Sequence, residues 1–169
     1  MIRDATPDDF NAILALNAES VQFLSPLTPE RLQWLHRMSA YHKVIEDDGV
    51  VAAFLLAFRE STSYDSPNYA WFVERYPTFV YIDRIVASPA YRGRGHAAAL
   101  YEDIAAFASR ARAPLLTCEF DLDPPNPASM QFHARMGFRE VGTQWLYGRT
   151  KQVSMQAKQL PATQRKVSP

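Results

Sequence analysis

The sequence predicts a single domain of the mixed α/β class, built on a sheet of about seven strands. The chain has 169 residues, which fits one domain better than two. Hydrophobic residues make up 47% of it and aromatic residues 12%, which is enough apolar surface for a core. Apolar patterns of helical and strand period follow one another in the order β-α-α-β-β-loop-β-α-β-α-β-β.

Local signals justify each element. Thr6 and Thr28 each precede a proline and an acidic residue, which is the pattern of an N-cap and a first helical turn. Gly49 separates two apolar runs and supplies the positive φ of a hairpin turn. Pro77 stops a short helix, and Asn126 can cap another. The predicted elements, in chain order, are a strand at Met1–Asp4, helices beginning at Thr6 and Thr28 (the second ending near Tyr41), hairpin strands at Lys43–Glu46 and Val50–Phe58, a polar loop at Arg59–Asn68, a short helix at Tyr69–Arg75, a strand at Thr78–Ala87, a helix at Gly93–Arg112, a strand at Leu115–Phe120, a helix from Asn126 to near Met136 and Gly137, and strands at Phe138–Leu146 and Val153–Leu160.

Bulk properties exclude several classes of protein. We expect a domain over residues 1–160 and a flexible tail over 161–169. Equal numbers of basic and acidic residues, 18 of each, argue against a nucleic-acid partner. The single cysteine, Cys118, makes an internal disulfide impossible and a thiolate metal site improbable, so we expect no metal. No apolar leader follows Met1, and the apolar runs are too short for a bilayer, which favours a cytoplasmic protein with no membrane partner.

The strongest chemical signal lies where a predicted strand passes into a predicted helix, at Arg92-Gly93-Arg94-Gly95. A helix N-terminus presents unpaired N–H groups and a partial positive charge. The two glycines let the backbone approach phosphate oxygens, and the two arginines can add charge-assisted hydrogen bonds. This predicts a diphosphate-binding loop, although an ordinary capped turn with two arginines remains open. A nucleotide P-loop and a dinucleotide fingerprint fit poorly, because no Gly-Lys-Ser/Thr and no third glycine follow.

The run Arg92-Gly93-Arg94-Gly95-His96-Ala97 resembles the signature Gln/Arg-x-x-Gly-x-Gly/Ala of the GNAT superfamily of acetyl-CoA-dependent N-acetyltransferases. The resemblance implies a GNAT-like fold with a mixed, mostly antiparallel sheet of about seven strands and about four main helices. It also implies acetyl-CoA as co-substrate, with its pyrophosphate on the loop and its pantetheine arm on a splayed strand. The cofactor-binding residues it implies are Ile85, Val86, Ala87, Arg92, Gly93, Arg94, Gly95, His96, Ala97 and Asn126. His96 departs from the usual aliphatic residue.

A second segment, Asn126 to Phe138, resembles the GNAT pattern of an Asn, a short helix and a terminal Gly-Phe. Asn126 is also an ordinary N-cap, and the resemblance adds a contact with the cofactor arm. His133 stands where many family members carry a Tyr that protonates the departing thiolate. A His can donate a proton at neutral pH, which makes His133 a candidate general acid. A half-buried helical His with no such role is the alternative.

Removal of the amine proton requires a base near the thioester. Asp83 and Glu119 are the first candidates on the central strands. Tyr81, which period-two alternation places on the same face as Asp83, and Asp121 are the others, and any of them could act directly or through water. Asp83 could instead form a structural ion pair with the adjacent Arg84. Cys118 lies in an apolar strand and is expected to be a small buried residue rather than a nucleophile.

The acceptor is expected along the loop and short helix at Arg59–Tyr76 and on the neighbouring strand. Aromatic walls with a few carboxylates suit a cationic amine. The candidate substrate-binding residues are Tyr64, Asp65, Tyr69, Trp71 and Tyr81, and Phe23, Trp34 and His36 are candidates on the opposite wall. A lid or a dimer contact is the alternative role of this segment.

The sequence therefore favours an enzyme that transfers an acetyl group from acetyl-CoA to a primary amine of a small molecule or peptide by direct attack. A CoA-binding regulatory or interaction module without turnover is the alternative, and a nucleotide-binding α/β domain is a third reading. Strand-mediated dimers are common in families of this shape, so a homodimer is possible.

Overall fold

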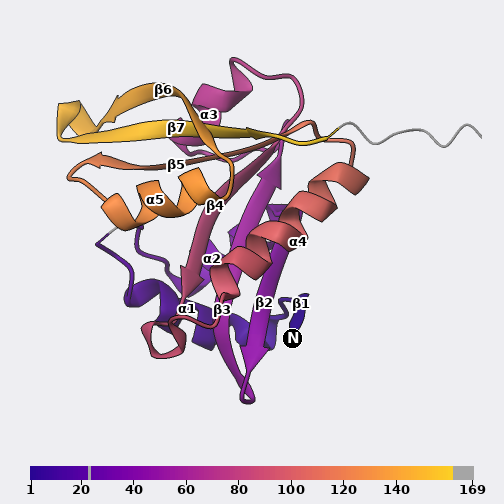
Figure 1. Cartoon of the computed structure of the whole chain (residues 1–169). Helices are drawn as coiled ribbons and strands as arrows, with labels where there is room; N and C mark the ends of the chain where they lie inside the picture. Colours follow the sequence, from indigo (N-terminus) through magenta and orange to yellow (C-terminus); the bar gives the residue numbers. More distant parts are fainter. Residues whose placement is uncertain (23, 162–169) are drawn as a thin grey trace, which may run out of the picture.

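The computed structural model describes residues 1–22 and 24–161, so the predicted tail falls almost wholly outside the described residues (Figure 1). The strands are β1 Ile2–Asp4, β2 Tyr41–Asp47, β3 Val50–Arg59, β4 Val80–Ala87, β5 Leu115–Asp123, β6 Arg139–Leu146 and β7 Lys151–Gln159. The α-helices are α1 Phe10–Ala18, α2 Pro29–Met38, α3 Pro67–Val73, α4 His96–Arg110 and α5 Pro127–Arg135. Short 3-10 turns lie at η1 Pro7–Asp9, η2 Pro89–Tyr91 and η3 Tyr147–Arg149. Within the described residues, no helix has the length and apolar character that crossing a membrane requires.

The strands form one seven-stranded sheet in the order β1-β2-β3-β4-β5-β7-β6. Every neighbouring pair is antiparallel except β4 and β5, which are parallel. The predicted fold class, a mixed and mostly antiparallel sheet of seven strands, is therefore confirmed. Among the described residues β4 and β5 pair only at Val80 with Leu116 and at Tyr81 with Thr117, and beyond these the two strands diverge (Figure 1).

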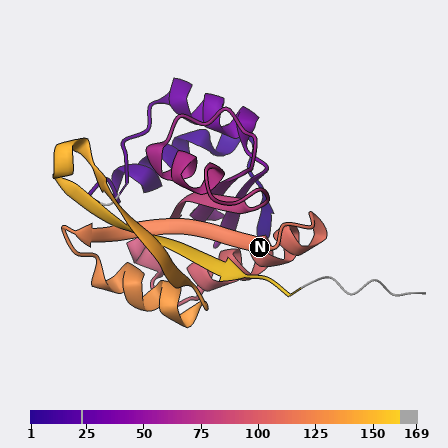
Figure 2. The same ribbon diagram turned by 90° about the horizontal axis from the view of Figure 1, so that it is seen from above.

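Helices cover both faces of the sheet (Figure 2). On one face, α4 packs Leu100 and Ile104 against β3 and β4 in the largest apolar cluster, and residues of α5 adjoin it. On the other face, α1 and α2 pack on β2 and β3, and α3 packs on β3 and β4. The ends of these helices therefore surround the gap between β4 and β5.

One extra residue in β4 changes which side chains face the gap. Leu56 pairs with Arg84, but the next residue of β3 pairs with Ile82, so Asp83 is the extra residue of a β-bulge. A bulge shifts the alternation of side chains and increases the local twist. Ile82 accordingly packs towards α4, whereas Arg84 contacts Asn17 of α1 on the opposite face.

Several predicted boundaries need correction. The helix predicted from Gly93 begins at His96, because Gly93 and Gly95 have φ of 81° and 78°, which are not helical. The helix predicted at Tyr69–Arg75 begins at Pro67, because the Ser66 side chain accepts a hydrogen bond from the Tyr69 N–H and caps it. The helix predicted to end near Tyr41 ends at Met38, since Tyr41 already belongs to β2.

Gly142 in β6 allows α3 to approach the sheet. A Cβ at this position would lie 2.6 Å from Cζ2 of Trp71. We expect Gly142→Ala to lower the free energy of unfolding by about 1–3 kcal/mol, because the indole or the strand must move. Urea denaturation measures the loss, and shortening the ring with Trp71→Leu in the Gly142→Ala background is the control. A loss below about 0.5 kcal/mol, the range of ordinary surface changes, would contradict this close packing.

Candidate functional site

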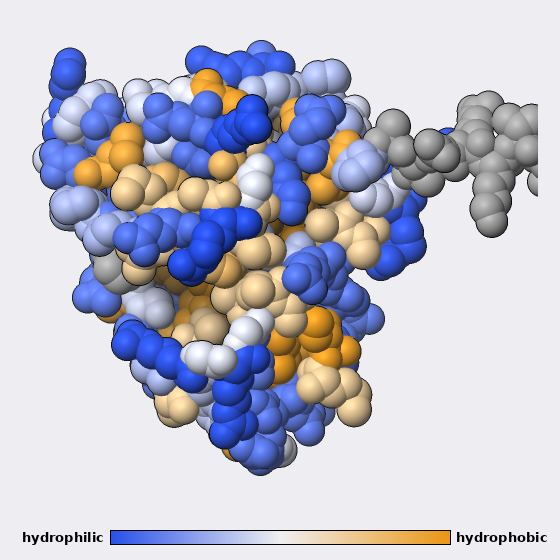
Figure 3. All heavy atoms as spheres, viewed as in Figure 1, coloured by the Kyte–Doolittle hydropathy of each residue, from blue (hydrophilic) through white to orange (hydrophobic). Residues whose placement is uncertain are grey.

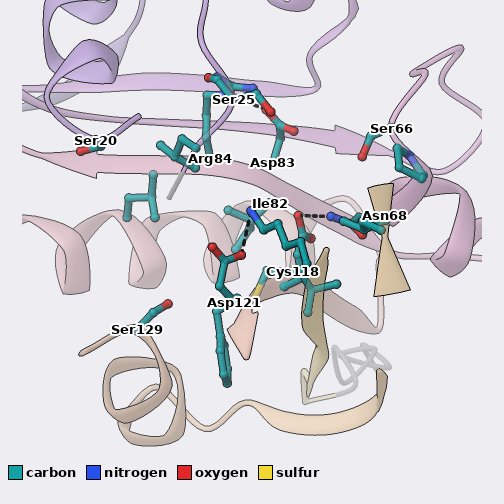
Figure 4. A pocket seen from close by; sticks show the side chains of 18 of the residues that line it. Ser20, Ser25, Ser66, Asn68, Ile82, Asp83, Arg84, Cys118, Asp121 and Ser129 are labelled. Atoms are coloured by element: carbon teal, nitrogen blue, oxygen red, sulfur yellow. Dashed lines mark hydrogen bonds and ion pairs between the residues drawn. The ribbon is translucent and has the colours of Figure 1, made fainter. Parts of the chain in front are cut away.

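The gap between β4 and β5 opens into a cavity of about 460 Å³. Its lining comes from β4, β5 and β7, from α2, α4 and α5, from the β6–β7 connection, from the loop after α1 and from the segment that enters α3. In Figure 4, Asp83 and Arg84 lie on one side of the cavity, and Asp121 and Ser129 lie on the other. Polar groups from both halves of the sheet thus converge on one space.

Glu119 is the lining residue with the most unusual environment. Its Oε1 accepts hydrogen bonds from Asn68 Nδ2 at 2.9 Å and from Tyr81 Oη at 3.0 Å. Its Oε2 is buried and has no hydrogen-bond partner among the described residues. Burial, and then the nearby Asp83 carboxylate, raise the pKa of Glu119 to about 8, although the two donated hydrogen bonds act in the opposite direction. A carboxyl group with this pKa can take up and release a proton near neutral pH.

The other acidic lining residues are each neutralised by a cation from the lining. Arg31 holds Asp65 with two hydrogen bonds, and Arg84 Nε lies 2.6 Å from Asp83 Oδ2. Lys151 Nζ lies 3.0 Å from Asp121 Oδ1. Among the described lining residues, Glu119 is therefore the acidic residue that forms no ion pair. When Glu119 is ionised, a cationic ligand entering the cavity would find its counter-charge there.

Asp83 is held by the protein at both oxygens. Besides the ion pair with Arg84, its Oδ1 accepts a hydrogen bond from Tyr64 Oη at 2.5 Å. Arg84 is buried and also donates to Asn17 Oδ1 at 3.0 Å and to the Ser25 carbonyl at 3.3 Å. This geometry fits the structural ion pair left open by the sequence better than a free base.

His133 is buried on α5, with both ring nitrogens engaged. Nδ1 lies 2.8 Å from the Ser129 carbonyl oxygen, which can only accept, so Nδ1 carries the proton of the neutral ring. Nε2 lies 2.8 Å from Tyr101 Oη and accepts in that tautomer. Burial lowers the pKa of His133, which favours the neutral ring. In this tautomer Nε2 carries no proton, so His133 could pass a proton to the Tyr101 hydroxyl only from the ring protonated at both nitrogens.

The loop before α4 has the features that a diphosphate requires. Both of its glycines have positive φ, and a Cβ on either would meet nothing within 4 Å, so the space over the backbone is open. The hydrogen bonds of α4 begin with the one from Ala99 N to Gly95 O, so the N–H groups of its first turn have no acceptor within the helix. Figure 3 shows a hollow between this loop and α5 on the face seen in Figure 1. The residues present therefore fit a bound diphosphate.

Arg94 and His96, two of the predicted cofactor-binding residues of this loop, are tied to the β2–β3 hairpin. Arg94 Nη1 lies 3.0 Å from carboxylate oxygens of both Asp47 and Asp48. His96 Nε2 lies 2.8 Å from Asp47 Oδ2. Arg92 is exposed at the loop surface. Arg94 and His96 thus anchor the loop in this structure. The N–H groups of Arg92 and Arg94 bond to Pro89 O and Tyr91 O, so the other N–H groups of the loop and the Arg92 side chain remain for an anion.

The strand edge beside this loop is open. Ile85, Val86 and Ala87 pair with β3, while the pairing of β4 with β5 ends at Tyr81. The polar backbone groups of β4 that point away from β3 can therefore hydrogen-bond an extended ligand. Asn126 lines the cavity and caps α5, accepting a hydrogen bond from Ser129 N at 3.1 Å. Its predicted N-cap role is confirmed.

The predicted acceptor residues separate into two groups. Tyr64 and Asp65 line the cavity. The other three, Tyr69, Trp71 and Tyr81, do not line it. Tyr69 donates a hydrogen bond to the Arg59 carbonyl, and Tyr81 donates one to Glu119. Trp71 packs on Gly142 and Arg75. Of the candidates on the opposite wall, Trp34 stacks on Arg31 and Tyr64, whereas His36 lies beside His42 at a separate small cavity. Phe23 lies outside the described residues.

Four polar residues of the site were not predicted as such from the sequence. Tyr101 looked like a core position of its helix, and Arg31, Lys151 and Gln144 carried no local signal. Only the fold brings them to the cavity or to its supporting residues. Cys118 also lines the cavity, but burial raises the pKa of its thiol well above the usual range, so its predicted role as a small buried residue is confirmed.

Sequence and structure comparisons agree with this geometry. A model of the Acetyltransferase (GNAT) family matches residues 8–138. The chain is 34% identical to a phosphinothricin N-acetyltransferase of Streptomyces coelicolor over 128 residues, which cover 73% of this chain and 69% of that protein.

Solved structures share the fold. An N-acetyltransferase from Staphylococcus aureus Mu50 matches with a TM-score of 0.72 and 22% identity, over 95% of this chain and 98% of that one. The ribosomal-protein-S18-alanine N-acetyltransferase from Escherichia coli matches with a TM-score of 0.73 and 13% identity, over 100% and 99% of the two chains. At these identities the structures support the architecture alone. Because the family match spans most of the sequence and a relative above 30% identity agrees with it, the chain belongs to the acetyltransferase (GNAT) family.

Proposed function

We propose that this chain transfers the acetyl group of acetyl-CoA to a primary amine by direct attack, and that Glu119 receives the proton which the amine loses. One observation carries the assignment of the base. Glu119 lines the cavity without a cationic partner among the described lining residues, and its buried Oε2 lacks a hydrogen-bond partner there. Its pKa of about 8 suits a base that must accept a proton near neutral pH.

Glu119 would act in two ways on the acceptor. Ionised, it attracts the ammonium form of an amine into a cavity whose other lining acids are already neutralised. It then accepts a proton at Oε2, because Oε1 is occupied by Asn68 and Tyr81. Burial, and then the negative field of Asp83, which is paired with Arg84, keep the pKa of Glu119 high.

Acetyl-CoA would supply the acetyl group as an activated thioester. The amides of Gly93 and Gly95 in the loop and of His96 and Ala97 at the start of α4, together with the Arg92 side chain, would hold its diphosphate. The free edge of β4 at Ile85–Ala87 and Asn126 would hold its extended arm. Arg94 and His96 would position the loop through Asp47. An acid role of His133 would need its doubly protonated ring, whose Nε2–H would donate to Tyr101 Oη while the Tyr101 hydroxyl gives its own proton to the departing thiolate.

The acceptor is proposed to be a small amine, bound near Tyr64 and Asp65. The relative from Streptomyces coelicolor is named for phosphinothricin, and the cavity of about 460 Å³ is of the size that small ligands occupy. A peptide amine is the second candidate, because one structural neighbour is named for a ribosomal-protein alanine.

CoA release during incubation of acetyl-CoA with a panel of amines tests the function. We expect at least one amine to release CoA stoichiometrically with its acetylated product, as measured with a thiol reagent and by mass spectrometry. Acetyl-CoA alone should raise the melting temperature of the protein. Gly93→Ala should reduce that rise, because it strains a backbone with φ of 81° and places a methyl group in the open space. A melting shift without CoA release from any amine would instead favour the CoA-binding module, and no shift at all would contradict both.

A further inference from the structure

The Glu119 carboxylate is held in one orientation by donors from two other elements. Asn68 of α3 and Tyr81 of β4 both donate to Oε1. The hydrogen bond of Asn68 is marked in Figure 4. The second oxygen, Oε2, is left as the one without a partner. The two oxygens of Glu119 are therefore distinguished by the protein before any ligand binds.

Asn68 is itself oriented by a third element. Gln144 of β6 donates from Nε2 to Asn68 Oδ1 at 2.9 Å. An Asn side chain has one accepting and one donating end, so the Gln144 bond turns Nδ2 of Asn68 towards Glu119. Asn68 is buried, with 9% of its surface exposed, and a reversed amide would place two donors and two acceptors against each other. The hydrogen bonds from Gln144 to Asn68 and from Asn68 to Glu119 are thus both formed in one orientation of the Asn68 amide.

We propose that Asn68, oriented by Gln144, is a positioning residue for Glu119 in the transfer reaction: it fixes the carboxylate so that Oε2 meets the amine, and it favours the ionised form. This inference rests on the proposed function of Glu119 as the proton acceptor. A hydrogen bond donated to a carboxylate stabilises its charged form. Without that bond the carboxylate gains a proton more readily and also gains freedom to turn.

A purely structural role makes a different prediction. If Asn68 only connects α3 to the sheet, its loss lowers stability and leaves the titration of Glu119 unchanged. The two roles are separated by the pH profile of kcat/KM and by the carboxyl chemical shift of Glu119 in protein labelled with carbon-13 glutamate. The chemical shift does not depend on turnover.

The experiment compares Asn68→Leu and Gln144→Leu with the wild type and with Val73→Ala, a control on the exposed side of the same helix. We expect Asn68→Leu to move the rising limb of the profile, and the NMR titration of Glu119, up by about one pH unit, which reduces kcat/KM at pH 7 about tenfold. Gln144→Leu should shift the activity profile and the NMR titration in the same direction by a smaller amount. Gln144 is only half-buried, so we expect this variant to fold. Val73→Ala should shift neither.

The outcomes separate the two proposals. If both leucine variants titrate like the wild type, the positioning role is overturned, and Gln144→Leu decides this even where Asn68→Leu does not fold. If the NMR titration moves but the activity profile does not, Asn68 sets the ionisation of a residue that is not the base, and the proposed function of Glu119 fails instead. A loss of stability with unchanged titration would leave Asn68 a structural residue.

Discussion

Glu119→Gln is expected to lower kcat at least about 100-fold with any amine that the wild-type protein acetylates, which is the usual range for loss of a general base. The substitution is nearly isosteric. The amide oxygen can still accept from Asn68 and Tyr81, and only the proton-accepting oxygen at the Oε2 position is lost. Steady-state kinetics measures kcat, and the melting shift with acetyl-CoA should remain.

The pH dependence of kcat/KM gives a second test of Glu119 as the base. A base must be ionised to act, so wild-type kcat/KM should rise with pH and level off above the pKa of Glu119, about 8. Glu119→Gln should remove that limb. An amine whose own pKa lies far from 8 keeps the two titrations apart. Glu74→Gln, at an exposed residue outside the cavity lining, is the control and should retain the limb. Activity of Glu119→Gln within a few-fold of wild type would assign the base to another group.

Asp83→Asn is expected to lower the free energy of unfolding by about 3–5 kcal/mol, because it leaves the buried Arg84 guanidinium without its counter-charge. This is a large part of the stability of a typical domain, which is about 5–15 kcal/mol. Urea denaturation at pH 7 measures the loss. The neighbouring bonds of Arg84 to Asn17 and the Ser25 carbonyl keep the cation in place, so it cannot move into water without unfolding the α1–α2 loop.

Two further variants test the cause. Asp48→Asn removes an acid from an exposed ion pair with Arg94 and should leave the urea midpoint close to that of the wild type, because water screens this pair. Replacing both partners, as Asp83→Asn with Arg84→Met, should recover part of the loss, because no unpaired charge remains buried. If Asp83→Asn unfolds at the same urea concentration as wild type, water must reach Arg84 and the pair is not structural.

The sequence predicted the fold because its signals are local. Thr28 before Pro29 marks a helix start, and the structure has Thr28 Oγ1 accepting from Arg31 N. Asn126 caps α5 as expected, and Gly137, with φ of 85°, follows its end. The predicted start of α3 at Tyr69 is wrong because Ser66 before Pro67 carries the same N-cap signal inside a polar segment whose composition resembles a loop.

The site was less predictable because its contacts are distant along the chain. Glu119 was one of several candidate bases, and nothing near it in the sequence distinguishes it. Asn68 lies 51 residues before it, and Gln144 lies 76 residues beyond Asn68. The bulge at Asp83 is not predictable from the sequence either, because a period-two strand pattern gives no sign of one extra residue.

The short parallel contact between β4 and β5 has a mechanical consequence. With two paired positions at Val80 and Tyr81, the sheet is close to two separate sheets, β1–β4 and β5–β7, which share one end. Such a junction offers little resistance to bending compared with a fully paired seam. A long ligand with amide groups that lies between the strands would act as a substitute strand, and its binding would stiffen the whole molecule rather than only its pocket.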